Sequence, residues 1–305
     1  MNGRVKIVAG NAKKLALGTV QFGMRYGVKN ALGRQPTDAE AFAVLDAALA
    51  FGICEYDTAS AYGAAEDVLG RYGLARKSVD GAPVCITSKL HPDADDDEES
   101  VLREIQDSLR RLRTDHIHCY MLHRADDMAR PAIMEGLVRA REEGWIAEVG
   151  VSIYEPEEAL RALQYPRIEI IQVPYNALDQ RLDAAGFFEK AHACGKRIYA
   201  RSAFLQGLLL MSPKEAEMQV KGSGAYVAQF QAIAADAGFS AGEAAMLYVL
   251  SHPGIDAVVF GVDTVEQLEK NMRIAEKINT FQFCYGKIRG AFADVPRGII
   301  VPSLW

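Results

Sequence analysis

The chain has 305 residues, of which half are hydrophobic and 24% are charged, and its formal net charge is -6. This length and composition allow a large apolar core and exclude disorder over most of the chain. The mild negative charge, with Lys and Arg scattered along the sequence, argues against a surface that binds nucleic acid or an anionic membrane. We therefore expect a small-molecule partner.

Short β-rich segments alternate with longer helix-like segments along the whole chain, and no linker interrupts them. This alternation is typical of parallel strands connected by helices. Strands are expected at residues 15–19, 53–57, 84–89, 117–122, 146–152, 168–173, 197–202 and 257–261. Eight strands favour a closed (β/α)8 TIM barrel, so we predict an α/β fold with a single domain over residues 1–305. An open doubly wound sheet usually has a G-x-G-x-x-G turn after its first strand, and this chain has none there.

Several of the predicted helices carry start signals. Three hydroxyl residues are each followed, three positions later, by Glu or Gln, which predicts capping boxes. The pairs are Thr37 with Glu40, Ser240 with Glu243 and Thr264 with Gln267. Pro156 suits the first turn of a helix, and the acidic run at 93–99 complements the N-terminus of a helix at 101–113.

The five cysteines contain no C-x-x-C pair, and Cys54, Cys85 and Cys119 lie in apolar, strand-like runs. Buried free thiols of this kind favour a reducing compartment. Residues 1–6 lack the apolar stretch of a signal peptide, and charged residues interrupt the longer apolar runs. We expect a cytoplasmic protein without a membrane segment, and the sequence indicates nothing about its oligomeric state.

Four polar residues follow or end successive predicted strands: Asp57, Tyr62, Lys89 and His123. In a barrel of this type, functional groups sit at the C-terminal ends of the strands and in the loops after them, so these side chains are expected on one rim. Each has a structural explanation when taken alone, such as an N-cap or a solvated strand end. Together, an acid, a phenol, an ammonium and an imidazole form a usable proton-transfer site.

Reduction of a carbonyl by hydride transfer puts negative charge on the carbonyl oxygen, so the site needs a donor that can give up its proton. Tyr62 meets both needs as the general acid. A nearby Lys89 ammonium would favour the phenolate form of Tyr62, and Asp57 would keep Lys89 charged and oriented. His123 would orient the carbonyl.

These segments resemble the aldo-keto reductase superfamily over nearly the whole chain. Leu17-Gly18-Thr19 resembles its first strand, Tyr56-Asp57-Thr58-Ala59 with Ala61-Tyr62-Gly63 resembles its Asp and Tyr motif, and Lys89 and Leu122-His123 complete its catalytic tetrad. The resemblance implies a (β/α)8 barrel and an NADPH-dependent reductase of aldehydes or ketones. It also implies a cofactor extended across the barrel mouth and no metal.

The resemblance further implies a set of cofactor contacts. They are Gly18, Thr19, Ser152, Gln172, Arg201, Ser202, Gly261, Gln267 and Asn271. Arg201 stands where many members stack Tyr or Trp on the nicotinamide, and its planar guanidinium can also stack. Ile153 stands where Asn is common after Ser152. The resemblance favours NADP(H) as the cofactor. Gly261 and Gln267 stand where many members bind the adenosine 2'-phosphate with Lys or Arg, so NAD(H) stays open.

Two other functions compete with this interpretation. His116-x-His118 resembles the histidine pair of zinc-dependent barrel hydrolases, but it begins the fourth predicted strand and would lie away from the expected rim. A cofactor-binding regulatory subunit with the same fold is the second alternative. The stretch 204–208 resembles members associated with bacterial sugar metabolism, which suggests a keto-sugar or a sugar aldehyde as substrate.

Overall fold

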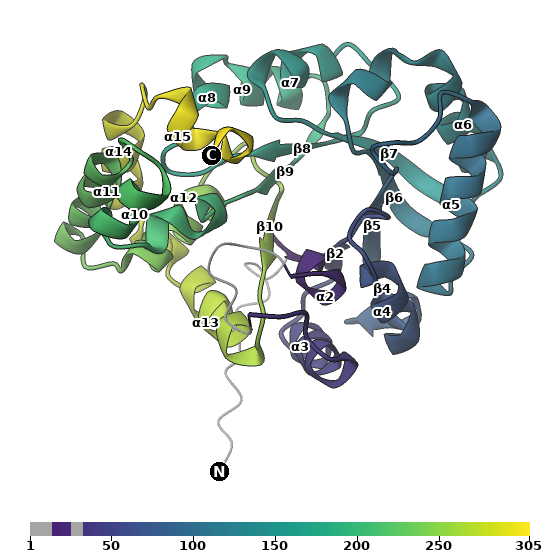
Figure 1. Cartoon of the computed structure of the whole chain (residues 1–305), viewed down its shortest axis with the longest axis horizontal. Coiled ribbons are helices and arrows are strands. Elements are labelled where there is room, and N and C mark those ends of the chain that lie inside the picture. Colours follow the sequence, from purple (N-terminus) through teal and green to yellow (C-terminus); the bar gives the residue numbers. More distant parts are fainter. Residues whose placement is uncertain (1–13, 26–32) are drawn as a thin grey trace.

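Eight parallel strands close into a barrel, and helices surround it (Figure 1). The computed structural model describes residues 14–25 and 33–305. The strands are β1 (Leu15–Gly18), β2 (Glu55–Asp57), β5 (Cys85–Lys89), β6 (Ile117–Leu122), β7 (Ile146–Ser152), β8 (Ile170–Pro174), β9 (Arg197–Arg201) and β10 (Ala257–Gly261). They pair in this order, and β10 closes the barrel against β1. The eight predicted strands are confirmed, and barrel closure excludes the open doubly wound sheet.

The strand bounds differ from the predicted ones by a few residues. The second strand was expected to begin at residue 53, but β2 begins at Glu55. Glu55 is the first residue of β2 that pairs with a residue of β5. A short antiparallel hairpin of β3 (Ser78–Val79) and β4 (Ala82–Pro83) was not predicted. Its Asp80-Gly81 turn has φ values of 51° and 83°, as the tight hairpin turn with this dipeptide requires. That dipeptide was the available signal.

Helices connect the strands and cover the outside of the barrel (Figure 1). They are α2 (Val20–Gly23), α3 (Asp38–Ala50), α4 (Ala65–Tyr72), α5 (Glu98–Leu112), α6 (Pro131–Glu142), α7 (Pro156–Ala162), α8 (Arg181–Ala184), α9 (Phe187–Ala193), α10 (Pro213–Gln219), α11 (Gly224–Asp236), α12 (Ala241–Leu250), α13 (Val265–Ala275), α14 (Gln282–Ala291) and α15 (Arg297–Ile300). Short 3-10 segments are η1 (Leu74–Arg76), η2 (Ala125–Ala129), η3 (Leu205–Leu210), η4 (Ile278–Thr280) and η5 (Pro302–Leu304).

The predicted helix starts are largely correct. Thr37 and Ser240 form complete capping boxes, and Pro156 opens α7. The third box is incomplete. The Thr264 hydroxyl accepts from the Gln267 N–H, but the Gln267 side chain accepts from the N–H of Asp263, one residue before the cap.

Alternating residues of the strands form two apolar layers. Leu15 and Leu17 of β1 point outward into the main core between strands and helices, whereas Ala16 points into the barrel. The interior contains Ala16, Cys119, Met121, Ile170, Tyr199 and Ala257. Because the barrel interior is filled by side chains, a ligand site has to form at a mouth of the barrel.

The five cysteines are free. No single helix in the described part of the chain is long and apolar enough to cross a membrane, although the bent pair α11 and α12 meets the criterion by length and composition. Residues 1–6, on which the expectation about a signal peptide rests, lie outside the described residues.

Candidate active site

A buried ion pair joins the ends of β2 and β5. The Lys89 ammonium donates to both carboxylate oxygens of Asp57, at 2.7 and 2.8 Å, and to the carbonyl oxygen of Thr58 at 2.9 Å. The Lys89 residue is 0% exposed and Asp57 is 4% exposed. These contacts hold the charge of Lys89 in one place.

Burial lowers the pKa of Lys89, but the Asp57 carboxylate and the Tyr62 phenol raise it by more, so the net pKa lies above its ordinary value. Lys89 is therefore a permanent cation beside the phenol. Its nitrogen lies 5.1 Å from the centre of the Tyr62 ring.

Tyr62 and His123 complete the group of four. Their rings meet edge to face, with centres 5.8 Å apart and an interplanar angle of 81°. Tyr62 comes from the loop after β2, and His123 directly follows β6. The structure thus brings together the four residues that the sequence placed at successive strand ends, and their catalytic roles stay predictions.

Two glycines set the position of the Tyr62 backbone. A Cβ on Gly23 would lie 1.7 Å from the Tyr62 carbonyl oxygen, and a Cβ on Gly63 would lie 2.4 Å from the Gly23 carbonyl oxygen. Gly63 also has a φ of 55°, a conformation that favours glycine. The end of α2 and the Tyr62 loop are therefore in direct backbone contact, with no side chain between them.

We expect Gly23→Ala to lower the kcat for any carbonyl substrate by about a hundredfold, because the added methyl group must push the Tyr62 loop by about an ångström. Steady-state kinetics measures the loss. Gly286→Ala is the matched control, since a Cβ at Gly286 in α14 meets nothing within 4 Å and should leave kcat unchanged. A wild-type kcat in Gly23→Ala would show that the Tyr62 position tolerates this shift.

His123 is held as a neutral imidazole. Burial, together with the positive charges of Lys89, Arg201 and His91, lowers the pKa of His123 to about 3. Its Nδ1 is buried without a hydrogen-bond partner among the described residues. A neutral imidazole can form hydrogen bonds but cannot act as a cationic acid.

The low pKa of His123 predicts a pH effect on stability. Below a pH of about 6.5 the unfolded chain gains a proton on this imidazole and the folded chain does not, so acid favours unfolding. Between pH 8 and pH 5 the free energy of unfolding should fall by about 2 kcal/mol more in the wild type than in His123→Gln. Urea denaturation at the two pH values measures the difference, and parallel curves for the two proteins would contradict the assignment.

Gln172 of β8 reaches the Asp57 carboxylate from the other side of the mouth. Its Nε2 donates to Asp57 Oδ2 at 2.7 Å, and the residue is 1% exposed. The sequence predicted Gln172 only as a cofactor contact, and no local signal indicated a bond to a residue 115 positions away. Ser152 pairs in register with Gln172 at the end of β7 and is buried.

A cavity of about 600 Å³ opens beside this group, a volume typical of small-molecule sites. Asp57 and Tyr62 line it, together with every predicted cofactor contact except Ser152. Those lining residues are Gly18, Thr19, Gln172, Arg201, Ser202, Gly261, Gln267 and Asn271.

The loop after β9 forms one wall of the cavity and has an unusual backbone. Ser202, Leu205 and Gln206 have φ values of 66°, 47° and 52°, and Gly207 has a φ of 95°. Strained residues of this kind persist where the surrounding structure determines them, often at ligand sites. Sequence reasoning placed Ser202 at the cofactor site but missed the backbone conformation of this loop, because Leu and Gln give no signal for a left-handed conformation.

The far end of the cavity lies at β10 and α13. A Cβ on Gly261 would lie 2.1 Å from the Gln21 side chain, so the glycine leaves room for Gln21. The Gln267 Oε1 accepts a hydrogen bond from the Asp263 N–H at 2.7 Å, just before the start of α13. Lys270 also lines the cavity. It supplies the positive charge at this end among the described residues that line the cavity.

His116 and His118 lie at the opposite end of β6. His116 Nδ1 lies 2.8 Å from the Gly144 carbonyl oxygen, and His118 Nε2 lies 3.5 Å from a Glu148 oxygen. Within residues 14–25 and 33–305, no three His, Cys, Asp or Glu side chains are grouped as metal ligands. This arrangement gives no support to the zinc hydrolase.

Comparisons with known proteins agree on one family. The model of the Aldo/keto reductase family matches residues 14–283. The chain is 26% identical over 323 residues to Protein tas of Escherichia coli, with 85% of this chain and 88% of that protein covered. It is 28% identical over 292 residues to the uncharacterized oxidoreductase Rv2298 of Mycobacterium tuberculosis, with 88% and 85% covered. The solved structure of PA4992 of Pseudomonas aeruginosa, assigned to the aldo-keto reductases, is similar with 26% identity and a TM-score of 0.65, with 87% and 90% covered.

Proposed function

The chain belongs to the aldo/keto reductase family and is therefore an NAD(P)H-dependent oxidoreductase of carbonyl compounds, and we propose that it reduces an aldehyde or ketone with Tyr62 as the general acid. The observation that carries the proposal is the phenol of Tyr62 beside the buried Lys89 and Asp57 pair, at the wall of a cavity. A preorganised positive charge next to a proton donor is what a developing oxyanion requires.

A nicotinamide cofactor bound in this cavity would supply the hydride that reduces the carbonyl carbon. Tyr62 donates its proton to the carbonyl oxygen, which yields the alcohol, and the Lys89 ammonium stabilises the phenolate until a proton from solvent restores the phenol. The neutral His123 imidazole orients the carbonyl oxygen, and Asp57 keeps Lys89 in position.

The lining of the cavity fits a nicotinamide cofactor extended across the barrel mouth. Near Tyr62, the Gln172 Oε1 is available to the carboxamide, since only the Nε2 of this residue bonds to Asp57. The Arg201 guanidinium offers a planar group to the nicotinamide ring. Asn271, which is buried, also lines the cavity with Lys270 and Gln267, and these residues would contact the adenosine part of the cofactor.

We propose NADP(H) as the working cofactor, with only a small preference over NAD(H). Gly261 and Gln267 supply no positive charge for a 2'-phosphate, the Gln267 Oε1 is already bonded, and Lys270 is an exposed side chain. The dissociation constants of NADPH and NADH should therefore agree within about tenfold, or about 1.4 kcal/mol. Fluorescence titration measures both constants, and a much larger preference for NADPH would show that the phosphate is bound elsewhere.

The same titration tests the function when aldehydes and keto-sugars are then added to the NADPH complex. Oxidation of NADPH supports the reductase and ranks its substrates. Tight NADPH binding without oxidation by any carbonyl would favour the regulatory subunit, and absence of binding to both cofactors would overturn the proposal. The free cysteines are consistent with a reducing compartment, and we propose the cytoplasm.

A further inference from the structure

Arg201 is a charge at the mouth of the barrel that forms no ion pair with any residue of the described part of the chain. Among the arginines in residues 14–25 and 33–305, it is the only one with a partly buried side chain and no carboxylate at ion-pair distance; the others in this class, such as Arg111 and Arg181, are paired. The remaining residues, 1–13 and 26–32, contain no Asp or Glu. A partly desolvated guanidinium without a counter-ion is costly, which points to an anion that arrives with a ligand.

The guanidinium is nevertheless held in one orientation. Its Nη2 donates to the Ile153 carbonyl oxygen at 3.0 Å, and its Nη1 donates to the Ser202 hydroxyl at 3.3 Å. One face lies on the Tyr154 ring, with 4.4 Å between the guanidinium carbon and the ring centre. Of the five N–H donors of an arginine, these contacts use two, so donors remain for a ligand.

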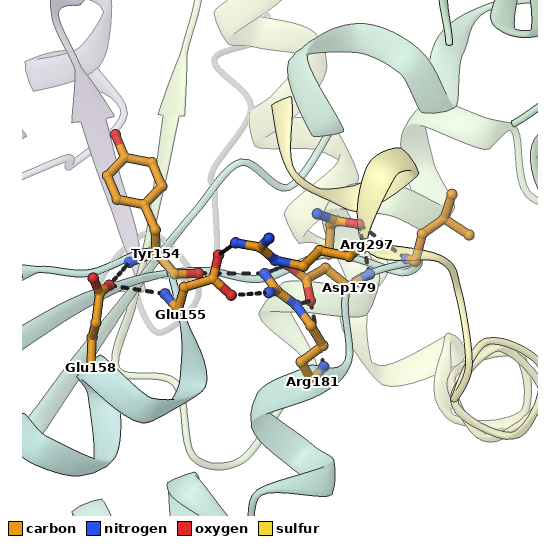
Figure 2. A network of polar contacts seen from close by, with 8 residues as sticks. Tyr154, Glu155, Glu158, Asp179, Arg181 and Arg297 are labelled. Atoms are coloured by element: carbon orange, nitrogen blue, oxygen red, sulfur yellow. Dashed lines mark hydrogen bonds and ion pairs between the residues drawn. The ribbon is translucent and has the colours of Figure 1, made fainter. Parts of the chain in front are cut away.

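A polar network holds the Tyr154 backbone at both ends (Figure 2). The Tyr154 N–H donates to Glu158 at 2.7 Å, and its carbonyl oxygen accepts from Arg181 at 3.4 Å. Arg181 also bonds Glu155 at 2.7 Å and makes two bonds to Asp179, at 2.8 and 2.9 Å.

The C-terminal part of the chain completes this network. Arg297, at the start of α15, bonds the second oxygen of Glu155 at 2.5 Å (Figure 2). Three segments of the chain therefore meet here: the loop after β7, the loop after β8 and the C-terminal region. The charged side chains of these segments pair with one another. The Tyr154 ring lies outside the network, and the residue is 48% exposed. The Arg201 guanidinium stacks on this ring.

We propose that Arg201 binds an oxyanion on the substrate, so that the preferred substrates are aldehydes or ketones that carry a carboxylate or a phosphate. This inference rests on the proposed reductase function and names its substrate class. Arg201 lines the same cavity as Tyr62, and its charge acts on His123, so it lies within reach of a molecule whose carbonyl is at Tyr62. A charge-assisted, forked contact suits both carboxylate and phosphate.

The test compares pairs of substrates that differ only by the anion. Succinic semialdehyde is paired with butanal, and glyceraldehyde 3-phosphate with glyceraldehyde, so the two arms distinguish carboxylate from phosphate. For the wild type we expect kcat/KM to be about tenfold to a hundredfold higher for the anionic member of at least one pair. Any effect of Arg201 on cofactor binding cancels in this ratio, because both members use the same NADPH complex.

Three variants separate the possible roles. Arg201→Gln should reduce the ratio to near one, Arg201→Lys should retain part of it, and Tyr154→Leu should lower it by loosening Arg201. Arg124→Gln is the matched control, because it removes an exposed arginine that follows His123 in the chain and donates to the Pro92 carbonyl oxygen. This control should keep the wild-type ratio.

A wild-type ratio near one in both pairs would overturn the proposal. An unchanged ratio in Arg201→Gln would also overturn it, and so would equal losses for both members of each pair, which would assign Arg201 to the cofactor alone.

If no aldehyde oxidises NADPH, the reductase proposal itself fails. The anion site is then tested by titrating the NADPH-loaded protein with succinate and with inorganic phosphate. Saturable binding to the wild type but not to Arg201→Gln would support the site, and no binding would overturn it.

Discussion

Tyr62→Phe is expected to lower kcat by a factor of about 10² to 10⁴, because it removes the proposed proton donor and leaves the ring in place. The ring of Tyr62 packs on His123 and near Lys89, so its shape should be preserved by Phe. The dissociation constant of NADPH should stay nearly unchanged. Stopped-flow measurement of NADPH oxidation, together with fluorescence titration, separates the two effects.

Tyr72→Phe is the matched control for this variant. In the wild type, the Tyr72 hydroxyl of α4 donates to Asp46 of α3 at 2.5 Å, away from the barrel mouth. This variant should turn over like the wild type. A Tyr62→Phe enzyme with the same kcat as the control would assign the proton to another donor.

Lys89→Met should lower both activity and stability. The substitution leaves the buried Asp57 carboxylate with the Gln172 amide as its remaining side-chain donor in the described part of the chain. Loss of one partner of a buried ion pair costs about 3–5 kcal/mol in the free energy of unfolding. Urea denaturation measures this loss, and turnover should fall because the phenolate of Tyr62 is no longer stabilised.

The double variant Lys89→Met with Asp57→Leu distinguishes the two effects. Replacing both charges by apolar groups removes the unpaired carboxylate, so most of the lost stability should return. Turnover should stay as low as in the single variant, since the ammonium is still absent. A double variant as unstable as Lys89→Met would show that the cost arises from packing and not from the unpaired charge.

These variants, together with Gly23→Ala and Arg201→Gln, change different parts of one site. In the proposed mechanism Tyr62 donates the proton, and Lys89 and Asp57 supply the charge beside it. Gly23 fixes the backbone position of Tyr62. Arg201 lines the same cavity and is expected to change which carbonyl compounds are accepted.

The sequence by itself determined the barrel and the residue types at its mouth. Hydrophobic alternation and capping pairs act over a few residues, so eight strands and starts such as Thr37 and Ser240 were predictable. Asp57, Tyr62, Lys89 and His123 were found because parallel strands end at the same mouth. The resemblance added the cofactor contacts, of which all except Ser152 line the cavity.

Only the tertiary structure decided how these residues are connected. The bond from Gln172 to Asp57 and the stacking of Arg201 on Tyr154 join segments that are distant or differently oriented in the chain. The left-handed Gln206 and the close approach of Gly23 to Tyr62 depend on neighbours that barrel closure brings together. Such contacts arise from the three-dimensional packing of side chains, for which local periodicity carries no signal.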